Sequence, residues 1–78
     1  MPTVLRIKGF RFFFFTNEAK EPVHIYVESN DRYAKFWLEP VQLAKSVGYT
    51  ARELSEIRNL ILENADVFKR RWDEYFGH

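Results

Sequence analysis

The stretch GFRFFFFTNE, residues 9–18, decides how the rest of the chain must be arranged. Successive side chains of a β-strand point to opposite faces of its sheet. Four consecutive phenylalanines therefore require cover on both faces of the strand that carries them. We expect one set of side chains to face the core and the other to face away from it: Phe10, Phe12 and Phe14 in the first set, and Arg11, Phe13 and Phe15 in the second.

The residues around this stretch predict a small antiparallel sheet of about four strands. Each run is β-rich or alternates apolar with polar side chains, and turn-forming residues separate it from the next run. The predicted strands cover residues 3–7, 10–15, 23–28 and 33–38. Short connections such as the dipeptide Lys8-Gly9 favour hairpins between neighbouring strands.

A short helix is predicted after the sheet. Glu39-Pro40 should end the fourth strand, because proline cannot donate a hydrogen bond to a sheet ladder. Proline is also favoured in the first turn of a helix, so the segment 40–47 is expected to form a short helix that Gly48 ends.

A long helix is predicted to follow. Thr50 and Glu53 have the spacing of a capping box, in which each residue satisfies a backbone N–H at the helix start. Steps of three and four then place an apolar stripe on one face. Its members are Leu54, Ile57, Ile61, Ala65, Phe68, Trp72 and Tyr75. The stripe favours one helix from about Ala51 to about Phe76, and a break near Asn64 to Asp66 is the alternative.

These elements predict a single α+β domain over residues 1–78, in which the long helix covers one face of the sheet. A core of this size is marginal, but 18% of the residues are aromatic and each buries a large area. The absence of cysteine excludes disulfides and thiolate metal sites.

Composition also limits the class of function. No apolar run approaches the length of a membrane span, and Arg6 and Lys8 interrupt any signal-peptide-like stretch, so we expect a cytoplasmic protein with no membrane partner. The formal net charge of +1 is far from that of a strongly basic nucleic-acid binder. No phosphate loop, dinucleotide fingerprint or metal-ligand spacing is present, so no cofactor and no metal are expected.

The strand side chains that alternate against the apolar set form the candidate site. If they share one face of the sheet, they gather cations, aromatic rings and one imidazole: Arg6, Arg11, His24, Tyr26, Tyr33, Lys35 and Trp37. Cations interleaved with aromatic rings suit RNA, since bases stack and phosphates need positive charge.

The same residues could cleave RNA without a metal. His24 could act as acid or base with Tyr26 as its helper, because imidazole exchanges protons near neutral pH. Arg6, Arg11 and Lys35 would hold phosphate, and Trp37 would complete the substrate-binding set. The structural alternative is that a polar face rich in arginine, lysine and tyrosine is ordinary in an antiparallel sheet, and that His24 serves only as a hydrogen-bonding residue.

Five separated blocks of the chain resemble the bacterial domain of unknown function 4160 family. They are PTVLRIKGFRFFFFTNE, EPVHIYVE, AKFWLEPVQLA, ARELSEI and WDEYF, in this order from Pro2 to Phe76. The family pattern has two histidines on one strand face. Here the first corresponds to His24, but Tyr26 occupies the second position and Val23 replaces a proline, which disfavours a two-histidine metal site.

The resemblance implies a partner. Genes of this family often neighbour a gene for a second small protein, and the pair is often proposed as a toxin–antitoxin module. The resemblance therefore implies a small cognate protein encoded nearby and a toxin role, but no particular activity. Binding or cleavage of RNA is the hypothesis that the cationic and aromatic strand residues add to it. Two further possibilities are a non-catalytic interaction module, such as the antitoxin half, and a homo-oligomer in which Phe13 and Phe15 pack across a two-fold axis.

Overall fold

The computed structural model describes residues 3–15 and 20–77. Five strands are followed by two helices, which confirms the α+β class and adds one strand to the predicted sheet. The strands are β1 (Thr3–Ile7), β2 (Phe10–Phe13), β3 (His24–Ser29), β4 (Arg32–Leu38) and β5 (Val41–Val47). The helices are α1 (Ala51–Glu63) and α2 (Ala65–Phe76).

The sheet is an antiparallel meander in which each strand pairs with the next along the chain. The hairpin predicted at Lys8-Gly9 is confirmed, and both residues adopt positive φ angles of 52° and 84°. This combination suits a two-residue turn, because its twist matches that of the flanking strands. Asn30, in the turn between β3 and β4, also has a positive φ of 54°.

The predicted short helix over residues 40–47 is wrong, because this segment forms the edge strand β5. The chain reverses at Glu39-Pro40, where the peptide bond is cis, and pairs antiparallel with β4 from Leu38 opposite Val41 to Tyr33 opposite Val47. Pro40 lies in the turn, so it interrupts no ladder. Backbone pairing with β4 overrides the helical propensity of this short segment.

The predicted helix start is confirmed, while the single long helix is replaced by its alternative, a break at Asn64. Thr50 and Glu53 form the reciprocal capping box at the start of α1. The Asn64 side chain donates to the Leu60 carbonyl oxygen at 2.8 Å. Such a bond competes with the regular helix ladder, and Asn64 leaves helical geometry with φ −118° and ψ 15° before α2 begins.

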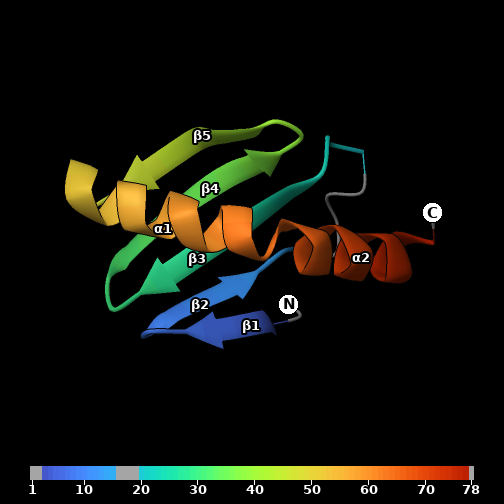
Figure 1. Ribbon diagram of the computed structural model, residues 1–78, viewed down its shortest axis with the longest axis horizontal. Helices are drawn as coiled ribbons and strands as arrows, with labels where there is room; N and C mark the ends of the chain where they lie inside the picture. The colour runs from blue at the N-terminus through green and yellow to red at the C-terminus, as the bar shows by residue number, and fades with distance from the viewer. Residues whose placement is uncertain (1–2, 16–19, 78) are drawn as a thin grey trace.

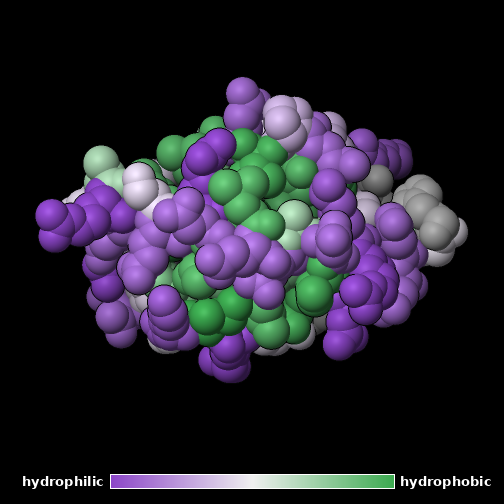
Figure 2. Space-filling view, viewed as in Figure 1, coloured by the Kyte–Doolittle hydropathy of each residue, from purple (hydrophilic) through white to green (hydrophobic). Residues whose placement is uncertain are grey.

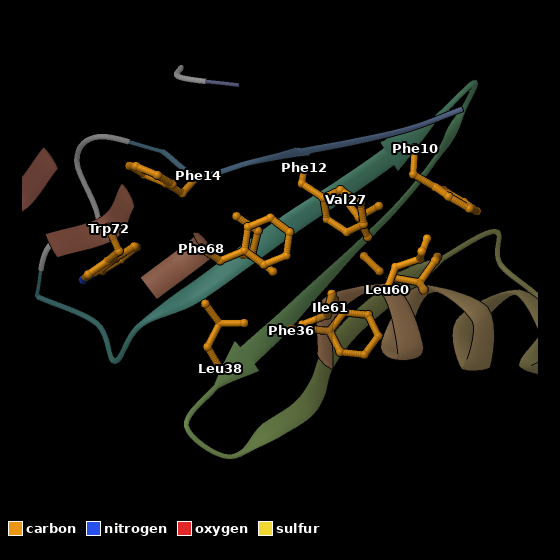
Figure 3. Close-up of a cluster of buried hydrophobic side chains, with 13 residues drawn as sticks. Phe10, Phe12, Phe14, Val27, Phe36, Leu38, Leu60, Ile61, Phe68 and Trp72 are labelled. Atoms are coloured by element: carbon orange, nitrogen blue, oxygen red, sulfur yellow. The ribbon is translucent and has the colours of Figure 1, made fainter. Parts of the chain in front are cut away.

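Both helices lie across one face of the sheet, and α2 continues past its end (Figure 1). The apolar stripes of the two helices meet the phenylalanines and aliphatic residues of the central strands in a single core (Figure 3). Phe12 packs on Phe68, with ring centroids 5.1 Å apart, and Phe14 packs on Trp72 at 5.4 Å. The outward sides of the helices carry mostly hydrophilic residues, with apolar ones between them (Figure 2).

The capping box makes the stability of the fold sensitive to acid. The Thr50 backbone N–H donates to the Glu53 carboxylate at 2.9 Å, and the Arg32 guanidinium lies 2.5 Å from the other carboxylate oxygen. These contacts, the backbone hydrogen bond first, hold the pKa of Glu53 below its ordinary value. A lowered pKa in the folded state means that the carboxylate stabilises the fold above its unfolded pKa and loses this contribution as pH falls through the folded value.

We therefore expect Glu53→Gln to lower the free energy of unfolding at pH 7, and to lose less stability than the wild type between about pH 5 and pH 3. Urea unfolding at pH 7, 5 and 3 measures this difference. Glu56→Gln is the matched control, since Glu56 is exposed on the same helix. An equal acid-induced loss in Glu53→Gln and the wild type would contradict the assignment.

Candidate functional site

The face of the sheet turned away from the helices, called here the open face, carries the predicted polar set. The register pairs Arg6 with Arg11 and Arg11 with Glu28, and residues two apart along each strand share this face. The same alternation applies to β4. On β5 the extra residue Ala44 interrupts it, and the open-face residues follow from their pairing with Tyr33, Lys35 and Trp37. The side chains of the open face are Arg6, Arg11, Phe13, His24, Tyr26, Glu28, Tyr33, Lys35, Trp37, Gln42, Lys45 and Val47.

A groove open to solvent, of about 610 Å³, runs over the middle of the open face. Its lining combines aromatic rings with charged side chains: Phe13, Phe15, Tyr26, Glu28, Tyr33, Lys35 and Lys45. Phe13 and Tyr26 stack with ring centroids 5.5 Å apart, and Phe15 lies edge-on to Tyr26 at 4.8 Å. The second pair of phenylalanines is thus covered by a small aromatic cluster outside the main core.

Two of the predicted cations are held by carboxylates on this face. The Arg11 guanidinium forms an ion pair with Glu28 and donates through Nε to Thr3 Oγ1 at 2.8 Å. Its charge also lies over the Phe13 ring, 4.5 Å from the centroid. The Lys35 ammonium contacts the Glu21 carboxylate at 2.6 Å and lies 4.5 Å from the Trp37 centroid. Both charges are therefore partly neutralised within the fold.

The contact with Lys35 also acts on the titration of Glu21. The hydrogen bond from the Lys35 ammonium is the largest cause that lowers the pKa of the Glu21 carboxyl. The positive charge of Lys35 acts in the same direction, and partial desolvation opposes both. Glu21 therefore stays ionised to a lower pH than an isolated glutamate would. This carboxylate belongs to the connection before β3, so the open face has a charged border contributed by a loop.

His24 does not lie on an accessible surface, contrary to the expectation for an exposed acid or base. Its side chain is fully buried, with 0% exposure. Nδ1 lies 2.8 Å from the Pro22 carbonyl oxygen, which can only accept, so Nδ1 carries the proton. The ring packs edge-on against Trp37 at 5.7 Å and Trp72 at 4.9 Å. Because α2 extends beyond the sheet, Trp72 closes the end of β3 over the imidazole. A role for His24 in proton transfer stays a prediction.

The remaining predicted site residues divide into two groups on the open face. Tyr26, Lys35 and Trp37 are contiguous, since Lys35 pairs with Tyr26 across the strands and its ammonium lies over both rings. Arg6 and Arg11 face each other at the β1–β2 edge, and Arg6 is exposed. Imidazole and arginines therefore share a face of the sheet but lie at opposite ends of β3, where Arg11 pairs with Glu28 and Trp37 with His24.

Sequence reasoning missed three charged residues of this face. Lys45 was assigned to a helix, and its strand position became visible only through pairing with Lys35. The ion pair between Glu28 and Arg11 depends on strand register, which the alternation of residues within each strand does not give. Glu21 lies in a loop, where no periodicity shows which way a side chain points. Within residues 3–15 and 20–77, no cluster of histidine and carboxylate side chains could hold a metal ion.

The two-layer arrangement of a five-stranded meander under a broken helix pair, with an aromatic and charged groove on its open face, defines a small α+β domain. The chain belongs to the domain of unknown function family DUF4160, whose family model matches residues 9–73. No curated protein and no solved structure shows a significant match to the chain. None of the helices among the described residues is long and apolar enough to cross a membrane.

Proposed function

We propose that this protein is the binding component of a bacterial two-protein module of the toxin–antitoxin kind, and that it holds a partner protein on its open face in the cytoplasm. The groove carries this proposal. It combines Phe13, Phe15, Tyr26 and Tyr33 with Lys35 and Lys45. Beside it, the Arg11 guanidinium lies over the Phe13 ring. Aromatic residues and arginine are the side chains enriched at protein interfaces, where a few of them supply most of the binding energy.

The edges of the sheet offer less to a partner than the open face does. Both edge strands carry one extra residue relative to their neighbour, Val4 on β1 and Ala44 on β5. Such bulges interrupt the row of backbone groups that an added strand would need. Side chains of the open face, and not strand addition, are therefore the favoured mode of contact.

The burial of His24 favours binding over catalysis. A general acid or base must come within hydrogen-bonding distance of the group whose proton it moves. In this fold the imidazole is enclosed by Trp37 and Trp72, and its Nδ1 is committed to the Pro22 carbonyl. Substrate contact would require rearrangement at the end of β3.

The test is co-expression with the protein encoded by the adjoining gene. We expect the two proteins to co-purify, and Tyr33→Ala to weaken their affinity by at least about tenfold, because loss of a central aromatic anchor typically costs more than 1 kcal/mol. Tyr75→Ala is the matched control, since Tyr75 is 53% exposed on α2, on the other side of the molecule. Failure to co-purify, or equal effects of the two variants, would contradict the proposal. Light scattering of the protein alone tests self-association.

An RNA-binding toxin is the second candidate, favoured by Arg6 and Lys45. Both are exposed on the open face, and no carboxylate among residues 3–15 and 20–77 pairs with either. This candidate predicts that expression of the protein alone arrests growth and that total RNA is bound or cleaved. Growth at the normal rate without the neighbouring protein would remove it.

A further inference from the structure

The open face contains two pairs of like charges that oppose folding. Arg6 lies directly opposite Arg11 in the β1–β2 register, and Lys45 lies directly opposite Lys35 in the β4–β5 register. Like charges facing each other across strands destabilise a sheet. In both pairs the inner cation is held by a carboxylate, Arg11 by Glu28 and Lys35 by Glu21. The outer cation of each pair has no carboxylate partner among the described residues.

These two outer cations lie at opposite edges of the open face. Lys45 lines the groove, and Arg6 lies beyond it, on the far side of the ion pair between Arg11 and Glu28. Arg6 is on β1 and Lys45 on β5, the two edge strands of the sheet. Adjacent strands lie about 4.8 Å apart, so the two positions are separated by roughly 20 Å. The aromatic rings of Phe13, Tyr26 and Tyr33 lie between them on the three inner strands. These rings, called here the aromatic floor, thus lie between two exposed positive charges, one on each edge strand.

From this arrangement we propose that the open face recognises an acidic segment of a partner protein, one that places carboxylates on Arg6 and Lys45 and an apolar side chain on the aromatic floor between them. An extended segment rises about 3.3 Å per residue, so about six residues would span the two cations. This inference rests on the proposed function, because it assumes that the open face binds a protein.

A protein segment fits this pattern better than RNA does. A polynucleotide carries a phosphate at every nucleotide, so a strand crossing the face would bring phosphates past Glu28 and Glu21. A protein segment can restrict its carboxylates to the two ends. Base stacking is also impeded, since the Tyr26 ring is stacked on Phe13 on one side and the Lys35 ammonium lies 5.7 Å from its centroid. The aromatic floor is therefore better suited to an apolar side chain than to bases.

The probe is a synthetic peptide, Glu-Glu-Leu-Trp-Leu-Leu-Glu-Glu, with two matched peptides in which lysine or glutamine replaces every glutamate. Each peptide is titrated into isotope-labelled protein, and NMR records the chemical shifts of the backbone amides. These shifts measure weak affinities and locate the residues in contact with the peptide. We expect the acidic peptide to bind roughly fivefold more tightly than the neutral one, a ratio in keeping with a few exposed ion pairs. The shifts should map to the open-face residues of β2, β3 and β4.

Charge reversal supplies the decisive comparison. The double variant Arg6→Glu with Lys45→Glu should prefer the lysine peptide, and its melting temperature should not fall, since both like-charge pairs become opposite-charge pairs. The matched control is Arg58→Glu with Arg70→Glu, because these arginines are exposed on the two helices. The control variant should still bind the acidic peptide more tightly than the lysine and glutamine peptides.

Three results would overturn the inference. They are equal affinities for the three peptides, an unchanged preference in the open-face double variant, and shifts confined to the helices. Displacement of the acidic peptide by an eight-nucleotide oligouridine would also overturn it, in favour of RNA. If Tyr33→Ala weakens binding of the neighbouring protein but the open-face double variant does not change it, the proposed function stands and only the inferred charge pattern is wrong. If no protein binds, the proposed function and this inference fall together.

Discussion

Phe12→Ala is expected to remove a large part of the free energy of unfolding at room temperature. Phe12 is fully buried, and its ring packs on Phe68 with centroids 5.1 Å apart, where β2 meets α2. Removing a buried phenylalanine costs about 3–5 kcal/mol, because transfer free energy is lost and a cavity remains. A domain of this length has a total stability of roughly 4–12 kcal/mol. Urea unfolding followed by circular dichroism measures the loss.

The matched control lies three positions along the same run of phenylalanines. Phe15 is partly exposed and touches Tyr26 and Phe13 on the open face. Phe15→Ala should cost about 1 kcal/mol, the contribution of exposed aromatic pairs. If Phe12→Ala is too unstable to purify, Phe12→Leu should show an intermediate loss of about 1–2 kcal/mol. Similar losses for alanine at both positions would mean that the two faces of β2 are not covered as the fold indicates.

The contrast between these two positions could be predicted from the sequence because it depends only on alternation. Four adjacent phenylalanines must divide between two faces, and the apolar stripe of the C-terminal helices identifies what covers one of them. The capping box at Thr50 is likewise local, since both of its partners lie within three residues. The division of the phenylalanines between two faces and the capping box could therefore be predicted, because both depend only on residues close together in the sequence.

Strand β5 could not be predicted because its conformation is decided by a distant partner. Val41–Val47 contains leucine, alanine, glutamine and lysine, residues that favour a helix when nothing else acts on them. Hydrogen bonding to β4 supplies a stronger constraint, and Gly48, with φ 90°, then turns the chain toward α1. A side chain there would also collide with Arg32, whose Cγ would lie 2.5 Å from an added Cβ. The error concealed Lys45, one of the two cations on which the inferred recognition depends.

The environment of His24 was missed for a related reason. Alternation correctly assigns the imidazole to the same face as Tyr26. It carries no information about the length of α2, whose Trp72 reaches past the end of the sheet and covers the ring. His24 lies in β3 and Trp72 in α2, far apart in the sequence, so the pattern within β3 gives no sign of this contact. The side chain of His24, a candidate acid or base from its position in the sequence, is therefore fully buried in the fold.

This enclosure predicts a large effect of His24→Ala on stability. The variant loses the packing of the ring between Trp37 and Trp72, and it leaves the Pro22 carbonyl oxygen without the Nδ1 donor. Loss of a buried hydrogen bond costs about 1–3 kcal/mol, and the cavity adds to it. We expect a total loss of about 2–4 kcal/mol, measured by urea unfolding at pH 7.

His24→Asn separates the structural role from a catalytic one. The asparagine amide nitrogen is the same number of bonds from the backbone as Nδ1, so it can donate to the Pro22 carbonyl oxygen, but it cannot act as an acid or base near neutral pH. If His24 is structural, this variant should be more stable than His24→Ala and should bind the neighbouring protein as the wild type does. If expression of the wild type alone arrests growth and the folded His24→Asn protein does not, the imidazole takes part in the chemistry and must become accessible. Equal growth with both proteins would favour a structural role for His24, to which its packing on Trp37 and Trp72 and its hydrogen bond to the Pro22 carbonyl contribute.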